Sequence, residues 1–277
     1  LLVVWGLAHL ALWRFSGSSW AGDTSLRKPA LFGISGGLTL LSFYWLQKLL
    51  PEIRMDRWLA LAMSIAMLAE VALISVQQWR GVPSHFNRQL PLDRWIDTSI
   101  TVLIGIVLLS LVIYAYRTFV SMRAPLDQRL AWQGGMAYLL ISCFIGAAIL
   151  VYGMLRVAAG ENPHVFGQAG VVKFPHGVAI HVIQALPLAC CSMTKLGVSL
   201  DRRVVVLKSL NISIAALLIF SIVQTLGGRA RGDVTVATLM LLIGSLLFAL
   251  PYLLTLSSSL FRQLSQQFQT PEESQSS

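Results

Sequence analysis

The chain has 277 residues, of which 56% are hydrophobic and 12% are charged, and its mean hydropathy is +0.70. Because soluble domains carry about 25% charged residues, this composition excludes a soluble globular protein and indicates a multi-span membrane protein. The formal net charge of +9 does not indicate nucleic-acid binding, since the 21 Lys and Arg residues are scattered in small groups over all the connections. We expect them to face the anionic headgroups of a lipid bilayer.

Seven apolar runs are each long enough to cross a bilayer as an α-helix, which takes about 20 residues. They lie near residues 28–50, 57–79, 97–121, 130–155, 175–197, 204–226 and 234–257. An eighth run, residues 1–13, is too short to span alone. We expect a truncated first span there rather than a signal peptide, because no basic segment precedes it and no small-residue cleavage site follows it.

The predicted fold is an all-α transmembrane helix bundle of about eight spans, forming a single domain over residues 1–258. Every connection is short, so no soluble domain fits between the spans and the function is expected in the bundle or its loops. Residues 259–277 are predicted to be a short interfacial segment and a disordered tail. The interfacial prediction rests on Leu260, Leu264 and Phe268, which repeat every four residues.

Glu70 is the only acidic residue inside any of the long apolar runs. An ionisable side chain at that depth costs about 3 kcal/mol or more unless it is paired, protonated or hydrated, so it marks a candidate functional site. Gln77 lies seven residues further along the same predicted helix and therefore on the same stripe. Together they predict a polar line toward one membrane face.

All five histidines fall on one side of the membrane when eight spans alternate in direction. His9 and His181 each lie five residues inside the same predicted surface, about 7.5 Å at 1.5 Å per residue. They are therefore predicted at matching depth, and Gln184 lies about one turn below His181 on nearly the same face.

The segment from Arg80 to Asn87 is predicted to form a structured loop at the mouth of this site. Gly81 and Pro83 restrict its turns, while Ser84 and Asn87 can bond nearby backbone. His176 opens a helix whose free N–H groups favour an anion or a lone pair. The predicted site comprises Glu70, Gln77, Arg80, His85, Asn87, His176, His181 and Gln184.

Three functional classes fit these residues. The first is transport or proton-coupled handling of a small molecule or ion, in which Glu70 is neutral when sealed from water and charged when wet. The second is a cofactor protein with redox activity or metal-dependent hydrolysis of a lipid or amide. The third is a non-catalytic scaffold or assembly module whose polar residues fix helix packing.

One haem or one zinc ion is the cofactor that the second class requires. His9 and His181 satisfy the equal-depth condition for a haem held by two imidazoles. Zinc ligands are available from His85, His176 and His181 together with Glu70. The spacing disfavours zinc, because His176 and His181 are five residues apart and point about 140° apart on a regular helix.

Sequence motifs of common enzymes are missing, including a Walker loop, GxGxxG, HExxH and GxSxG. Ser84, His85 and Asp93 are close in sequence, but adjacent Ser and His are poorly placed to act as nucleophile and base. The strings RKPALFG, RGVPSHFN and FPHGVAIHVIQALPL resemble segments of a family of uncharacterised bacterial multi-pass membrane proteins. The resemblance implies a place in the bacterial cell (inner) membrane and no particular activity.

Overall fold

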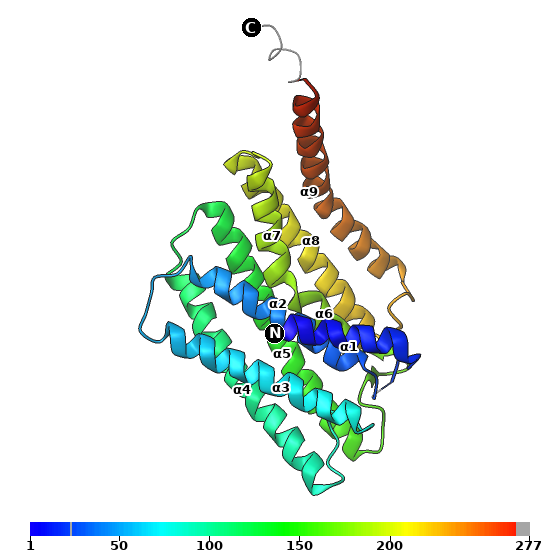
Figure 1. Cartoon of the computed structure of the whole chain (residues 1–277). Helices are drawn as coiled ribbons and strands as arrows, with labels where there is room; N and C mark the ends of the chain where they lie inside the picture. Colours follow the sequence, from blue (N-terminus) through cyan, green and yellow to red (C-terminus); the bar gives the residue numbers. More distant parts are fainter. Residues whose placement is uncertain (23, 270–277) are drawn as a thin grey trace. The chain divides into compact units, whose positions relative to one another are not determined.

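The computed structural model describes residues 1–22 and 24–269, with side chains up to residue 265 (Figure 1). Its helices are α1 (Leu2–Ser16), α2 (Arg27–Gln47), α3 (Asp56–Trp79), α4 (Pro91–Val120), α5 (Leu126–Ala158), α6 (Lys173–Ile180), α7 (Val182–Lys195), α8 (Leu200–Leu226) and α9 (Val236–Gln269). A short antiparallel ribbon pairs β1 (Val165–Phe166) with β2 (Gly170–Val171). The predicted all-α fold is confirmed.

Seven segments are long and apolar enough to cross a membrane. They are α2, α3, α4, α5, the pair α6 and α7 taken together, α8, and α9 as far as residue 265. The shorter apolar helix α1 has 15 residues. The chain is therefore a multi-pass integral membrane protein. The predicted interfacial segment continues α9 to Gln269, and the predicted disordered tail from residue 270 lies outside the described residues.

The helices form two compact units. Unit 1 comprises Leu1–Arg123 and Leu150–Pro163, and unit 2 comprises Ala124–Ile149 and His164–Ser277. Helix α5 thus begins in unit 2 and ends in unit 1. The single domain expected over residues 1–258 stays a prediction.

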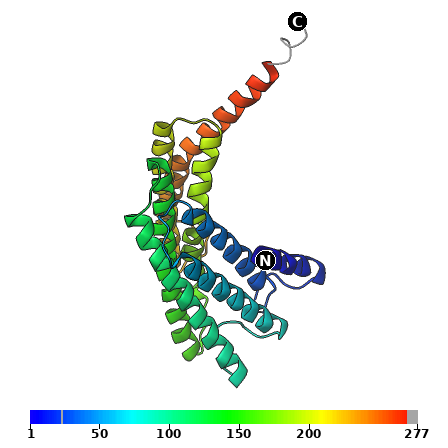
Figure 2. The same cartoon turned by 60° about the vertical axis from the view of Figure 1, so that its left-hand side comes forward.

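In unit 1, α1 packs against α2 through glycines that bring the two backbones together (Figures 1 and 2). A Cβ added to Gly33 would lie 2.8 Å from the Cα of Gly6, and one added to Gly6 would lie 2.6 Å from the backbone nitrogen of Ile34. Small residues let membrane helices approach closely, where van der Waals contact replaces the hydrophobic effect.

Helices α3 and α4 form an antiparallel hairpin that is closed by an ion pair at each end. Arg117, near the end of α4, binds Asp56 at the start of α3 and donates to the carbonyl of Pro51 at 2.6 Å. Arg80, directly after α3, binds the Oδ1 of Asp93 in the first turn of α4 at 2.6 Å. Each carboxylate also lies at a helix N-terminus, where the helix dipole favours negative charge.

In unit 2, α8 packs against α6, α7 and α9. Its apolar core comprises Ala131, Val182, Leu186, Cys190, Met193, Val198, Val206 and Leu207. The start of α8 is joined to the start of α5 by Arg203, whose Nε lies 2.7 Å from Oδ2 of the buried Asp127. The thiol of Cys190 approaches the same oxygen at 3.5 Å.

The close contact of α1 with α2 predicts that Gly33→Ala destabilises the protein. The added methyl group needs a backbone shift, and overpacking of this kind costs about 1–3 kcal/mol. The control is Gly105→Ala, because a Cβ at Gly105 meets nothing within 4 Å. Thermal unfolding in detergent should show a lower midpoint for Gly33→Ala alone, and equal midpoints would contradict the packing described.

Candidate functional site

Glu70 lies on the buried stripe of α3. Its side chain is 9% exposed, and it shares the stripe with the buried residues Met63, Ala66, Ile74 and Gln77. Within the described part of the chain, no hydrogen bond or ion pair reaches its carboxyl group. The carboxyl is therefore a buried acidic group without a compensating partner in the described structure. This is the kind of group for which the sequence analysis chose Glu70 as a candidate.

The polar stripe ends in a network at the junction of α3 and α4. Gln77 is fully buried, and its Nε2 donates to Oδ1 of Asp93 at 3.2 Å. Arg80 donates to the Oε1 of Gln77 and to the same oxygen of Asp93. Asp93 was missed as a site residue by the sequence analysis. The available signal was its place in the first turn of a helix that begins at Pro91, facing back to a nearby arginine.

The loop after α3 is ordered by local bonds, as its composition predicts. The Oδ1 of Asn87 accepts from the backbone N–H of Gln89 at 3.4 Å, and the backbone N–H of Phe86 donates to Asp97 at 3.2 Å. Phe86 has φ of 62°, a left-handed conformation that is unusual for a bulky residue. Its ring packs against Gly153, where a Cβ would collide with the ring. The strained backbone of Phe86 is therefore held by the hydrogen bond to Asp97 and by the packing of its ring on Gly153.

Ser84 and His85 are hydrogen-bonded to each other, with the hydroxyl 2.9 Å from Nδ1. That the two residues are poorly placed to act as nucleophile and base stays a prediction. The Oδ1 of Asp93 accepts hydrogen bonds from Arg80 and Gln77. The ring of His85 lies 6.0 Å from that of Phe32, between ring centroids.

His9 is 2% exposed and is enclosed by tryptophans of α1 and α3. Its ring stacks on that of Trp79 with centroids 5.6 Å apart and planes 11° apart, and the Trp5 ring lies 5.3 Å away. The Nδ1 of His9 lies 2.9 Å from the carbonyl of Trp5. Because a carbonyl only accepts, Nδ1 carries a proton there. The buried Nε2 has no hydrogen-bond partner among the described residues.

Trp13 lies one turn after His9 on α1 and shares this property. Its indole Nε1 is buried and has no hydrogen-bond partner in the described chain, and its ring packs edge-on against Trp20 at 4.4 Å. This face of α1 thus presents a buried donor one turn from His9. Neither the cage of tryptophans nor Trp13 was part of the predicted site, since Trp13 and Trp79 near helix ends are expected as membrane-interface anchors.

In unit 2, the helix containing the remaining candidates is interrupted at His181. Helix α6 ends at Ile180 and α7 begins at Val182, with His181 between them at φ −95° and ψ 5°. The Nδ1 of His181 lies 3.3 Å from Oε1 of Gln184, as donor to that oxygen. The predicted proximity of these two side chains is present, although His181 is exposed rather than buried.

His176 is held by Ser142 of α5. The Nδ1 of His176 lies 2.9 Å from the backbone oxygen of Ser142, and the Ser142 hydroxyl donates to the backbone oxygen of His176 at 3.1 Å. Gly146, one turn further along α5, leaves space for the ring, since a Cβ there would lie 3.4 Å from the imidazole. The sequence analysis missed both partners, because nothing local in the sequence indicates that α5 lies beside α6.

The candidates therefore divide between the two units. Unit 1 contains the residues His9, Glu70, Gln77, Arg80, His85 and Asn87, and unit 2 contains His176, His181 and Gln184. One site shared by Glu70 and His181, and one haem between His9 and His181, both stay predictions. Among the described residues, no group of three His, Cys, Asp or Glu side chains is arranged to hold a metal ion.

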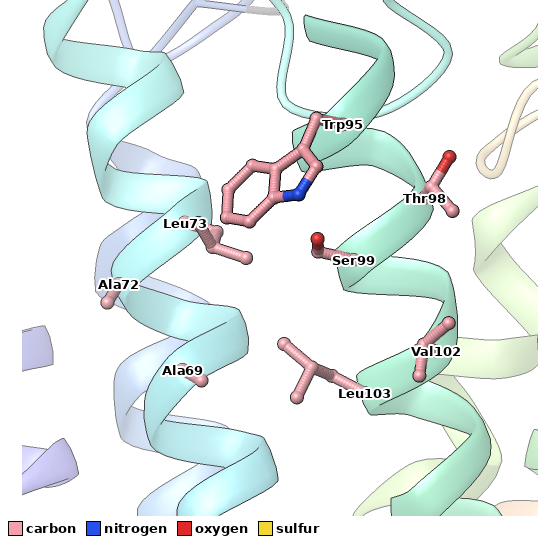
Figure 3. A pocket seen from close by; sticks show the side chains of 8 residues that line it. All are labelled: Ala69, Ala72, Leu73, Trp95, Thr98, Ser99, Val102 and Leu103. Atoms are coloured by element: carbon pink, nitrogen blue, oxygen red, sulfur yellow. The ribbon is translucent and has the colours of Figure 1, made fainter. Parts of the chain in front are cut away.

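A groove of about 580 Å³ lies between α3 and α4, the two helices of the hairpin that contains Glu70 (Figure 3). Its walls are Ala69, Ala72 and Leu73 on α3, and Trp95, Thr98, Ser99, Val102 and Leu103 on α4. In Figure 3 the indole of Trp95 extends across one end of the groove. Glu70 is not part of the lining, so the groove is separate from the carboxyl and mainly apolar.

Comparison of this chain with models of protein families, with curated proteins and with solved structures finds no match. The class of protein is thus defined by the fold: a multi-pass integral membrane protein with seven helical segments that are able to cross the bilayer.

Asp93→Asn is predicted to weaken the junction of α3 and α4, because it leaves the charge of Arg80 without its partner. The unfolding midpoint in detergent should fall further than for Asp201→Asn, which changes an exposed acid in the first turn of α8. Adding Arg80→Gln to Asp93→Asn should restore part of the loss. An Asp93→Asn midpoint equal to that of the control would show that the pair contributes nothing.

Proposed function

We propose that the protein moves a small polar solute or ion across the membrane and that this movement is coupled to protonation of Glu70. The single observation that carries the proposal is the buried carboxyl of Glu70, which no described residue pairs with. Acidic groups that only fix helix packing are expected to be hydrogen-bonded, because an unpaired polar group inside a bilayer is costly. A carboxyl left alone instead exchanges its proton when water or a solute reaches it.

Polar side chains lie on α3 between Glu70 and the loop that follows the helix, and a proton or solute needs such groups on its path. Gln77 is seven residues away, about 10 Å along the helix, and it bonds directly to the network of Arg80 and Asp93. A proton or solute that enters from that end of α3 meets amide, guanidinium and carboxylate groups before it reaches Glu70. The resemblance of the three segments to bacterial membrane proteins supports a place in the bacterial cell membrane.

The test is Glu70→Gln in liposomes that contain a trapped pH indicator. A panel of amino acids, sugars, organic acids and metal cations is added outside, and proton movement that depends on a solute is recorded. We expect one class to move protons with the unchanged protein. With Glu70→Gln the rate should fall about tenfold or more, since a group that transfers the proton contributes at least that much.

The matched control is Glu52→Gln, which removes an exposed carboxyl group in the connection between α2 and α3. It should transport like the unchanged protein. A solute that crosses at the same rate in Glu70→Gln at every pH would overturn the coupling. Absence of proton movement for every class in the panel would overturn the transport proposal itself.

His9 supports a second candidate function, the binding of a metal as haem or as an ion. Histidines that bind metals usually donate their other ring nitrogen to a carbonyl or carboxylate, which fixes the tautomer and the ring. The Nδ1 of His9 donates to Trp5 in this way, and the Nε2 lone pair is left free to coordinate. Trp79 and Trp5 supply flat apolar walls. A bound haem would supply electron transfer at this position.

Absorption spectra of the purified protein, oxidised and reduced, together with elemental analysis, test this second candidate. A Soret band or one equivalent of metal is expected, and it should be lost in His9→Gln. The control is His164→Gln, which replaces the one histidine outside the candidate set. A colourless protein that contains no metal after expression with added iron and haem precursor would overturn the second candidate and leave the first untouched.

A further inference from the structure

A second groove lies in unit 2, between the start of α8 and the second half of α9. Its volume is about 810 Å³, and it is lined by Arg202, Leu254, Ser257, Ser258, Phe261 and Arg262. The two helices are antiparallel neighbours, as Figures 1 and 2 show, and the Nε of Arg202 donates to Oγ1 of Thr255 at 3.3 Å. The groove thus joins the two helices at one end of the bundle.

The two arginines at this groove differ from those that close the helix ends elsewhere. Arg202 and Arg262 are exposed, and neither forms an ion pair with any acidic group of the described chain. Arg262 donates only to the backbone oxygen of Ser258 and the hydroxyl of Ser259, both at 3.3 Å. No ion pair joins Asp201 to either arginine. Two positive charges therefore face one groove without an acidic partner among the residues that the structure describes.

The depth of these side chains matches the layers of a bilayer. From the start of α9 at Val236, Leu254 lies about 27 Å along the helix axis and Arg262 about 39 Å, at 1.5 Å per residue. The hydrocarbon core of a bilayer is about 30 Å thick. Arg262 is therefore placed at the headgroup level, while Leu254 is placed at the edge of the acyl region. Arg202, the third residue of α8, is at the matching end of the neighbouring span.

The groove also has an apolar wall. Leu254 is 56% exposed and Phe261 is 71% exposed, and both line the groove beside the arginines. A ligand that satisfies both parts carries an anionic group and an apolar chain. Guanidinium groups bind phosphate oxygens in pairs of parallel hydrogen bonds, and basic pockets between membrane helices bind anionic headgroups.

We propose that this groove is a binding site for an anionic phospholipid. The phosphate is held between Arg202 and Arg262, and one acyl chain lies along Leu254 and Phe261. The bound lipid neutralises the two arginines in the way that aspartates neutralise Arg80, Arg117 and Arg203 elsewhere in the chain. The site depends on unit 2 alone and is independent of the proposed role of Glu70.

The test is native mass spectrometry of the whole protein, released from detergent after incubation with phosphatidylglycerol, phosphatidylcholine or inorganic phosphate. We expect phosphatidylglycerol to be retained about thirtyfold more than phosphatidylcholine, since each of the two arginines near the surface contributes about 1 kcal/mol and about 1.4 kcal/mol is tenfold. In the double variant Arg202→Gln, Arg262→Gln the retention should fall to the phosphatidylcholine level. Excess inorganic phosphate should not displace the lipid.

The matched control is Arg129→Gln. Arg129 is exposed in the first turn of α5 and does not line the groove. An ion pair between Asp127 and Arg203 joins the start of α5 to the start of α8. It should retain phosphatidylglycerol normally, as should Glu70→Gln. Unchanged retention in the double variant, equal retention of phosphatidylcholine, or displacement by phosphate alone would each overturn the proposal. If the double variant fails to fold, Phe261→Gln replaces it, and retention must still fall.

Discussion

Ion pairs between arginine and aspartate at helix ends hold two pairs of helices together in this protein, α3 with α4 and α5 with α8. Inside a bilayer, helices gain little from the hydrophobic effect when they associate, since lipid tails are as apolar as their side chains. Directional polar contacts therefore carry more of the specificity. Three pairs each join the first turn of one helix to another helix: Asp56 with Arg117, Asp93 with Arg80, and Asp127 with Arg203. Each pair is buried on at least one side, so its geometry is fixed.

Against this background, Glu70 and His9 are exceptions. Asp56, Asp93 and Asp127 have arginine partners, whereas Glu70 has no partner and the Nε2 of His9 has no hydrogen-bond partner in the described chain. Both groups lie in unit 1 and inside the apolar layer, where an unpaired polar group costs most. The pairing of the three buried or half-buried aspartates at helix starts sets the unpaired carboxyl of Glu70 apart. That contrast supports the roles proposed for Glu70 and His9.

The spans could be predicted from sequence because bilayer thickness fixes the length of an apolar helix, and Glu70 and Gln77 could be placed on one stripe because helical periodicity is local. The partners could not be predicted. Asp93 binds Arg80 across a turn, and Ser142 holds His176 from a helix far away in sequence. The interruption at His181 was also missed, because residues 181–186 contain neither glycine nor proline. Contacts between distant segments leave no periodic trace in a single sequence.

The ion pairs that close the hairpin of α3 and α4 also bear on how the chain enters the membrane. Both of them lie within residues 56–117, so the two partners of each pair belong to one continuous stretch of chain. Both ion pairs of the hairpin therefore have their partners available as soon as Arg117 has been synthesised. Asp127, in contrast, must wait for Arg203, which follows 76 residues later. The ion pairs of the hairpin of α3 and α4 therefore become possible earlier in synthesis than the pair that joins α5 to α8.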